Sequence, residues 1–521
     1  MVRHTARTRG VIAVAAFAAT ALTLTACSGS GGDADGGGEA DTASLVIGLD
    51  ADQAPQGYDP LLYSNGQRFF FEGMYDSLFE IGEDGSVVPS AATDFSFNED
   101  FTQMTLDVDT TLTFDDGTAL SADLVKENLD QRDNPDLNAY RELGAGGETE
   151  ITDVEVVDED TLTLTFAVPQ PGFQGNLAFP GGAIVGPTGL ADRASLDTVP
   201  DGSGPLTVDS DATIKGNSYV LVKKDGADRA ADYPFDSYEF KPILDPQART
   251  NALISGEVEI TLLAADTTDQ VESSGKAVAL NGGTIWNLFA MDKAGALNPA
   301  FGDPLVAKAL SIAINRPEYV AAVHPGQEPT WNVLPADSPG FIPELEDEYA
   351  YDPEAAKDLL AEAGYADGLE FEWTIQNRTQ RDLEALQTYW AAIGVDVTLN
   401  MAASTEELFA AVRTNYMGGP LNLTWSNPLG NINGVLFGFA NFHGAEGPEI
   451  QAAAQAYGAA QDDAARAEAL TGINRAIVDS GWLIPLYEEF AAWGYEQGKV
   501  AEPTFAGAEA YPILASIQPA S

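Results

Sequence analysis

The chain has 521 residues, and its 80 Asp and Glu against 25 Lys and Arg give a formal net charge of −55 at pH 7. A surface that binds nucleic acid needs clustered Lys and Arg, and no such cluster follows the first ten residues, so the composition excludes nucleic acid as a partner. Hydrophobic residues make up 45% of the chain, which is typical of a globular protein with a large core, and the length predicts about three folding units.

The side chains that usually hold structural metals or disulfides are scarce. Cys27 is the only cysteine, and the three histidines are His4, His324 and His443. A single cysteine excludes an intramolecular disulfide and a cysteine metal cluster, and no HExxH spacing is present. We therefore expect no metal site and no cofactor.

The first 26 residues have the pattern of an export signal. Arg3, Arg7 and Arg9 precede an apolar stretch, residues 11–26, which is shorter than the roughly 20 residues of a membrane-spanning helix. The stretch ends in Leu-Thr-Ala-Cys at Cys27, which resembles a bacterial lipobox. The resemblance implies that residues 1–26 are removed and that Cys27 is lipidated. A cysteine buried in a short helix is the less favoured alternative, because this cysteine ends the apolar run.

Residues 27–43 are rich in Gly, Asp and Ser and have almost no apolar side chains, a composition typical of a flexible tether. A lipid, a tether and a folded body predict a protein that is held at a membrane and works in solution. We therefore expect an extracytoplasmic protein, anchored to the cell membrane through Cys27, whose body does not span the bilayer.

The first half of the body is predicted to be rich in strands. Residues 44–50, SLVIGLD, form a short apolar run next to turn residues and predict a strand. Residues 105–114 and 161–168 alternate between apolar and polar side chains, which is the period of a strand with one buried face.

The second half is predicted to alternate between helices and strands. Asp303-Pro304 and Asp352-Pro353 each combine an N-cap Asp with Pro at the first helical position, and they predict two helix starts. A third helical face runs through residues 383–393 and stops at Gly394, and residues 395–399 then alternate as a strand. This order predicts an α/β protein.

Five stretches in chain order resemble the extracellular solute-binding proteins of family 5, the peptide and nickel class of ABC importers. The first, FDDGTALSADLV at residues 114–125, is similar to the family's F-x-D-G-T-x-L-T/S-A-D-D-V run, where Ser121 is placed to cap a helix. The other four are residues 249–260, 303–319, 351–368 and 482–487. Together they extend over nearly the whole body and follow the predicted lipobox.

The resemblance implies an α/β fold of the two-lobed periplasmic-binding-protein type (type II, cluster C-like) with an extra inserted domain. The implied ranges are 44–57, 190–285 and 496–521 for domain I, 58–189 for the inserted domain II, and 286–495 for domain III, the second ligand lobe. Two connections, near Trp286 and near Trp493, would act as a hinge, and the lobes would close around a bound ligand.

The resemblance also implies three segments that contact the ligand. Tyr63, Ser64 and Asn65 would line it from domain I, with a surface turn as the alternative. Trp286 and Asn287 would contact it from the crossing into domain III, with a place in the hinge core as the alternative for Trp286. The remaining implied contacts are Arg413, Asn422, Trp425, Ser426 and Asn427, and a solvated position on a helix is the alternative for Arg413.

The run that starts at Asn422 differs from that of peptide-binding members, in which an Asp pairs with the α-amino group of the peptide. Here residues 422–428 contain no acid, and a buried ammonium without a counter-charge is costly. The resemblance makes peptides or a related polar solute the first hypothesis. The missing acid favours the second hypothesis, a non-peptide solute such as an oligosaccharide, an opine or a metal chelate.

An exported hydrolase is the third hypothesis. Its only candidates are the carboxylate pairs Asp115-Asp116 and Glu488-Glu489, and neighbouring residues on a strand point to opposite faces. We therefore expect a monomeric binding protein and not an enzyme. Its expected partners are the solute, an ABC permease and, through the lipid on Cys27, the membrane.

Overall fold

The structure of the protein is a computed structural model that describes residues 44–82, 85–141, 143–147, 149–170, 172–227, 229–425, 428–460 and 462–520. These residues belong to one compact unit, Ala40–Ser521. The predictions for the leader 1–26, for the tether 27–43 with the lipidation site Cys27, and for the ligand contacts Ser426 and Asn427 lie outside the described residues.

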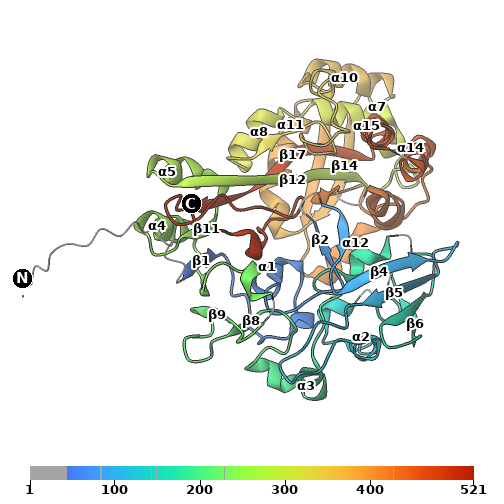
Figure 1. Cartoon of the computed structure of the whole chain (residues 1–521). Coiled ribbons are helices and arrows are strands. Elements are labelled where there is room, and N and C mark those ends of the chain that lie inside the picture. Colours follow the sequence, from blue (N-terminus) through green and yellow to red (C-terminus); the bar gives the residue numbers. More distant parts are fainter. Residues whose placement is uncertain are drawn as a thin grey trace, which may run out of the picture. The chain divides into compact units, whose positions relative to one another are not determined.

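A mixed nine-stranded sheet organises this unit (Figure 1). Strand β1 lies inside it and pairs in parallel with β10 and β11. The alternating apolar residues of β1, Leu45, Ile47 and Leu49, are fully buried, as the sequence predicts for this strand. In sheet order the strands are β16 (Met417–Thr424), β12 (Ala277–Ala290), β17 (Leu483–Tyr495), β11 (Ile260–Leu263), β1 (Leu45–Leu49), β10 (Ser237–Pro242), β9 (Tyr219–Lys223) and β8 (Leu206–Val208), with β13 (Glu328–Pro329) paired to β17.

Three smaller sheets complete the strand arrangement. The four-stranded antiparallel sheet has the order β4 (Ala92–Phe97), β5 (Gln103–Val108), β7 (Thr161–Phe166) and β6 (Ile151–Val156). The two pairs are β2 (Phe79–Ile81) with β3 (Val87–Pro89), and β14 (Leu369–Ile375) with β15 (Val395–Met401), the latter parallel. The alternation in β7 buries Leu162, Leu164 and Phe166, which confirms the predicted strand.

Helices flank these sheets, and their starts follow the predicted caps. Asp303, Asp352 and Ser121 each accept a hydrogen bond from a backbone N–H in the first turn of the helix that follows. The helices are α1 (Arg68–Phe71), α2 (Ala122–Leu129), α3 (Pro187–Ala191), α4 (Pro246–Ser255), α5 (Thr268–Ser273), α6 (Pro299–Gly302), α7 (Pro304–Ile312), α8 (Arg316–Val323), α9 (Leu345–Glu348), α10 (Pro353–Glu362), α11 (Gln380–Ala391), α12 (Thr405–Val412), α13 (Pro428–Gly430), α14 (Pro448–Ala459) and α15 (Asp463–Ser480).

The strand predicted over residues 105–114 is wrong beyond Val108, where β5 ends. Asp109 ends it, because its side-chain oxygen accepts hydrogen bonds from the backbone N–H of Thr111 at 2.9 Å and from the Thr111 hydroxyl at 2.6 Å. Such an Asp turn redirects the backbone and competes with strand pairing. Residues 109–114 continue the alternating pattern in the sequence, but they do not form a strand continuous with β5.

Two large hydrophobic cores contact different stretches of one long strand pair. The first core takes side chains from Leu45 to Ala279 and again from Trp493 to Ile517, and the second takes side chains from Leu288 to Tyr487. Strands β12 and β17 contribute to both cores. Residues from the predicted domains I and II share the first core, and the predicted domain boundaries stay a prediction.

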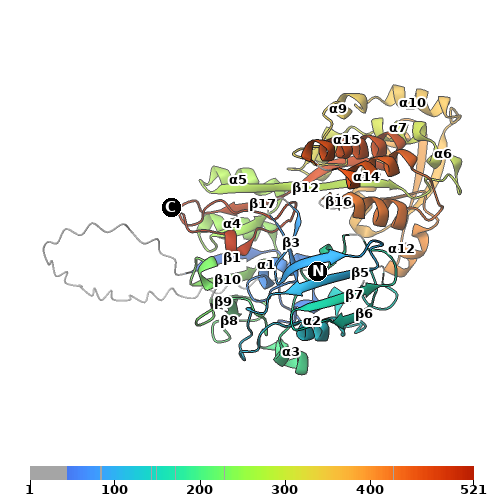
Figure 2. The same ribbon diagram turned by 45° about the vertical axis from the view of Figure 1, so that its right-hand side comes forward.

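Strands β12 and β17 form a ribbon that joins the two cores (Figure 2). They pair antiparallel from Ala277 with Tyr495 to Phe289 with Leu483. The register shifts between Asn281 and Thr284 and again after Trp286, and such bulges bend a strand locally. The predicted hinge positions lie at different places on this β12–β17 ribbon: Trp493 belongs to the first core, and Trp286 packs against the second.

Lys293 follows β12 and makes the stability of the fold sensitive to alkaline pH. Burial lowers the pKa of its ammonium group to about 8 from the ordinary value of 10.5, although Asp303 acts in the opposite direction. Between these two values the unfolded chain holds a proton that the folded chain has released, so the free energy of unfolding rises with pH. We expect Lys293→Met to remove part of this rise between about pH 8 and about pH 10, measured by urea unfolding.

The matched control is Lys357→Met, because Lys357 is an exposed residue of α10 paired with Glu354. This variant should keep the wild-type pH dependence. Equal slopes in the wild type and in Lys293→Met would contradict the burial of the Lys293 ammonium.

Candidate functional site

One face of the sheet, at the β12–β17 ribbon, gathers polar and aromatic side chains. Trp286 lies opposite Asn422 on β16 and opposite Tyr487 on β17, and Thr284 lies opposite Thr424 and Glu489. Directly opposite residues of antiparallel strands share a face. The ligand face, as we call it, therefore consists of Thr284, Trp286, Asn422, Thr424, Tyr487 and Glu489.

The ligand face is accessible to solvent at most of its positions. Asn422 and Thr424 are exposed, and Thr284, Trp286 and Glu489 are half-buried. Two residues expected to contact a ligand, Trp286 and Asn422, thus meet on this face, although more than 130 residues separate them in sequence.

A stack of rings supports Trp286. The Trp286 and Tyr487 rings are nearly parallel, with centroids 5.8 Å apart, and Tyr487 stacks in turn on His324 at 4.2 Å. Asp382 receives a hydrogen bond from the Tyr319 hydroxyl at 2.5 Å and lies 2.5 Å from Nε2 of His324. Burial raises the pKa of Tyr487, and the nearby carboxylates of Glu489 and Asp382 raise it further. The Tyr487 phenol is therefore neutral at physiological pH.

Glu489 contacts the same indole from its edge. The Nε1–H of Trp286 donates a hydrogen bond to Oε2 of Glu489 at 2.8 Å. With the ring stack on one side and this bond at its edge, the indole has a fixed orientation. A fixed, partly exposed aromatic ring gives a binding surface that loses little conformational entropy when a ligand arrives.

The neighbouring Glu488 points to the opposite face. It is buried, and its two oxygens accept hydrogen bonds from the backbone N–H groups of Gly283 and Ala336 at 3.0 and 3.1 Å. Burial raises the pKa of Glu488. The two carboxylates therefore do not face each other, so this pair is unsuited to acid/base catalysis, as the sequence predicts for neighbours on a strand.

Asn287 and Trp425 do not lie on the ligand face. Asn287 is fully buried and its Nδ2 donates to the carbonyl of Ile285 at 2.8 Å. Trp425 is buried in the second core. In the described ranges, neither Oδ1 of Asn287 nor Nε1 of Trp425 has a hydrogen-bond partner. Their predicted ligand contacts stay predictions.

The N-terminal segment places only part of its expected contacts at the surface. The Tyr63 ring is buried, and its hydroxyl donates to the Gly57 carbonyl at 2.8 Å and accepts from the Gln56 N–H at 2.9 Å. Ser64 is exposed and donates from its hydroxyl to the side chain of Gln67. Tyr63 therefore orders this turn from inside, and a ligand contact through it stays a prediction.

Asn65 is connected to the β12–β17 ribbon. Its Nδ2 donates to Oε2 of Glu509 at 2.9 Å, and the Glu509 carbonyl accepts from Nδ2 of Asn281 on β12 at 2.8 Å. Asn281 precedes Trp286 by five residues. The first predicted contact segment, which contains Asn65, is therefore linked through Glu509 to β12, the strand that carries the second segment with Trp286.

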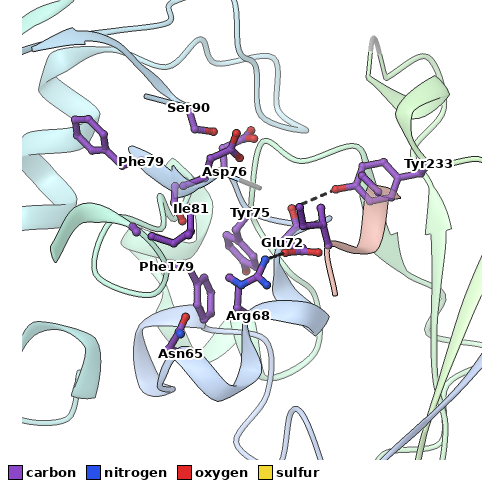
Figure 3. Close-up of a pocket in the computed structure, with 16 residues that line it drawn as sticks. Asn65, Arg68, Glu72, Tyr75, Asp76, Phe79, Ile81, Ser90, Phe179 and Tyr233 are labelled. Carbon is purple, nitrogen blue, oxygen red and sulfur yellow. Dashed lines mark hydrogen bonds and ion pairs between the residues drawn. The ribbon is translucent and has the colours of Figure 1, made fainter. Parts of the chain in front are cut away.

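A cavity of about 270 Å³ lies next to Asn65 (Figure 3). Arg68 and Glu72, which form an ion pair, and Asp76 are charged residues of its wall. Asp76 is paired from outside the wall by Arg229, whose Nη1 and Nη2 donate to the carboxylate at 2.6 Å each. Burial raises the pKa of Glu72, and Arg68 counteracts this effect. Because these charges are paired within the protein, we interpret them as structural.

Arg413 is an exposed residue at the C-terminal end of α12. Its guanidinium lies 4.8 Å from the ring centroid of Phe442, a cation–π contact. Phe439, which packs against Phe442, also lines a second cavity of about 190 Å³ together with Trp373 and Arg378. Arg413 is therefore accessible, and its predicted contact with a ligand stays a prediction.

The described residues show neither a metal-binding cluster nor a membrane-spanning helix. They contain no group of three or more His, Cys, Asp or Glu placed to hold a metal ion. None of their helices has both the length and the apolar character needed to cross a bilayer.

Known proteins that resemble this chain point to one family. The family model described as "Bacterial extracellular solute-binding proteins, family 5 Middle" matches residues 86–446, well over half of the chain. The glutathione-binding protein GsiB of Pectobacterium atrosepticum is 26% identical over 340 residues, which are 63% of this chain and 63% of that protein. The chain thus matches 63% of the length of this curated relative.

Solved structures share the fold at low sequence identity. HbpA2 from Haemophilus parasuis matches with a TM-score of 0.75 and 20% identity, covering 91% of this chain and 99% of that one. AgaA from A. tumefaciens R10, solved in complex with agropinic acid, matches with a TM-score of 0.67 and 20% identity, covering 92% and 99%. These likenesses confirm the predicted α/β binding-protein fold. Together with the family match, they show that the chain belongs to the bacterial extracellular solute-binding proteins of family 5.

Proposed function

We propose that the protein is the solute-binding component of an ABC importer, which captures peptides or a related polar solute and delivers them to a membrane permease. Family membership supports this proposal, and so does the similarity to GsiB, a glutathione-binding protein. The observation that carries it is the ligand face, where partly exposed Trp286, on a strand that joins the two cores, lies opposite exposed Asn422 on β16.

The proposed mechanism is closure of two lobes around the solute. The proposed domains keep the ranges predicted from the sequence: residues 44–57, 190–285 and 496–521 in domain I, 58–189 in domain II and 286–495 in domain III. A ligand that contacts both lobes binds the closed form more tightly, and this difference in affinity shifts the population towards the closed form. The permease would recognise the closed form, and the protein would bind its solute without changing it chemically.

We place the protein outside the cytoplasm, held at the membrane by a lipid on Cys27 and working as a monomer. The composition of residues 1–43 and the description of the family as extracellular support this location. An opine-like or other non-peptide solute is the second candidate. The absence of an acid in residues 422–428 favours it, and so does the agropinic acid complex of the structurally similar AgaA.

Thermal unfolding against a ligand panel tests the proposed function. The panel contains free-amine tri- to pentapeptides, the same peptides N-acetylated, neutral oligosaccharides and opines. A ligand at 100 times its Kd should add about 2.7 kcal/mol to the free energy of unfolding, which raises the Tm by at least about 1 °C. A panel in which no member raises the Tm would contradict the proposal.

A further inference from the structure

Glu489 lacks the partners that three nearby acids, Glu259, Glu488 and Glu496, have. Glu496 pairs with Lys276, Glu259 pairs with Lys499, and Glu488 accepts two backbone hydrogen bonds. In the part of the chain that the structure describes, the Glu489 carboxylate accepts one hydrogen bond, from the Trp286 indole, and no Lys, Arg or His pairs with it. Among the described residues, Glu489 is therefore a half-buried carboxylate that no cationic side chain of the protein neutralises.

The surroundings of Glu489 suit a cation better than a neutral group. The Trp286 ring attracts a cation to its π face, and it is stacked on the neutral Tyr487 phenol. The carboxylate next to the ring can form a charge-assisted hydrogen bond, about twice as strong as a bond between neutral groups. The excess of 80 acids over 25 basic residues in the chain also attracts cations from solution.

The rest of the ligand face supplies neutral groups. Thr284, Thr424 and Asn422 lie across the strands from Glu489 and Trp286 and carry hydroxyl and amide groups. They can bind the polar, uncharged part of a solute, such as a peptide backbone. The face therefore has one charged end, at β17, and one neutral polar end, at β16.

We propose that Glu489 and Trp286 together form a subsite for the cationic group of the solute, an ammonium or a guanidinium. This inference rests on the proposed function and makes it more specific, because it assigns the solute a positive charge. Adjacent strands lie about 4.8 Å apart, so Glu489 on β17 lies two strand spacings, roughly 10 Å, from Thr424 on β16.

The alternative is that Glu489 only holds the indole in place. Glu489→Gln separates the two roles, because the glutamine carbonyl can still accept the hydrogen bond from Trp286 Nε1 but carries no charge. A loss of cation binding with an unchanged Tm would then be due to the charge. The matched control is Glu370→Gln, an exposed strand residue of β14 outside the ligand face.

The experiment is calorimetric titration of the wild type and both variants with trialanine and with N-acetyl-trialanine at neutral pH, together with those panel members that stabilise the wild type. We expect Glu489→Gln to weaken binding of trialanine by about 10-fold or more and binding of the acetylated peptide by less than about 2-fold. Glu370→Gln should bind both peptides as the wild type does. If another cationic member of the panel is bound instead of trialanine, the same difference is expected for it.

The remaining outcomes separate this inference from the proposed function. Equal affinity of the wild type and Glu489→Gln for every cationic ligand would overturn the subsite and leave the proposed function intact. Binding of neutral panel members alone would likewise overturn the subsite and leave the proposed function intact. A wild type that binds no member of the panel would contradict the proposed function itself, and the subsite with it.

Discussion

Trp493→Ala is expected to destabilise the protein by about 3–5 kcal/mol, because it removes a large side chain from the centre of the first core. Trp493 is fully buried and lies edge-on against Phe69 and Tyr511, with ring centroids 5.4 and 5.9 Å away. Its Nε1–H also donates to the carbonyl of Ala510 at 2.9 Å, and the variant would leave this acceptor without its partner. The measurement is the midpoint of urea unfolding followed by far-ultraviolet circular dichroism.

The control for this variant is Leu280→Ala, on the paired strand of the same ribbon. Leu280 lies next to Ala279, which is opposite Trp493, but its side chain is 59% exposed. Its removal should change the stability by no more than about 0.5 kcal/mol. If the two variants unfolded at the same urea concentration, Trp493 would not be a central contact of the first core.

The sequence predicts best those parts of the fold that depend on near neighbours. The N-caps at Ser121, Asp303 and Asp352 involve bonds between residues two or three positions apart, and all three are present. The end of β5 depends on one side chain, Asp109, whose turn interrupts an alternating pattern. An apolar pattern alone does not show that the Asp109 side chain competes with strand pairing for backbone hydrogen bonds, so the predicted strand is too long.

The contacts of the site depend on long-range pairing, and the sequence predicts them less well. Trp286 and Asn422 are expected from the family resemblance, but their shared face depends on the register between β12 and β16. The sequence pairs Glu489 only with its chain neighbour Glu488, although the hydrogen-bond partner of Glu489 is Trp286, 203 residues away. An alternating pattern within β17 places Glu489 and Tyr487 on one face, but it does not show which strand pairs beside them.

The burial of Tyr63 is a feature that the sequence does not predict. A polar aromatic residue next to Ser and Asn is typical of a binding turn, and the sequence contains no signal that its ring points inwards. In the structure, both hydrogen-bonding functions of its hydroxyl are used by the backbone of Gln56 and Gly57. A buried hydroxyl needs such partners, and only the folded turn supplies them.

Gly481→Ala is expected to have the other large effect, a loss of roughly 2–5 kcal/mol. Gly481 ends helix α15 with φ 71° and ψ 30°, a left-handed conformation that costs other residues about 1–2 kcal/mol. A Cβ at this position would also lie 2.2 Å from the Cβ of Ala307 on α7. The clash would separate two helices of the second core, at an additional cost of about 1–3 kcal/mol. Urea unfolding measures the sum.

Gly256→Ala isolates the first of these two effects. Gly256 ends helix α4 with φ 78° and ψ 23°, nearly the same conformation, but a Cβ there would meet no atom within 4 Å. This variant should therefore lose only about 1–2 kcal/mol. Adding Ala307→Gly to Gly481→Ala should restore part of the difference, because it removes the clashing methyl group at a cost of about 0.5–1 kcal/mol for a glycine within α7. Two outcomes would contradict the close packing of α7 and α15 at Gly481. One is an equal loss of stability in Gly481→Ala and Gly256→Ala, and the other is no recovery of stability when Ala307→Gly is added to Gly481→Ala.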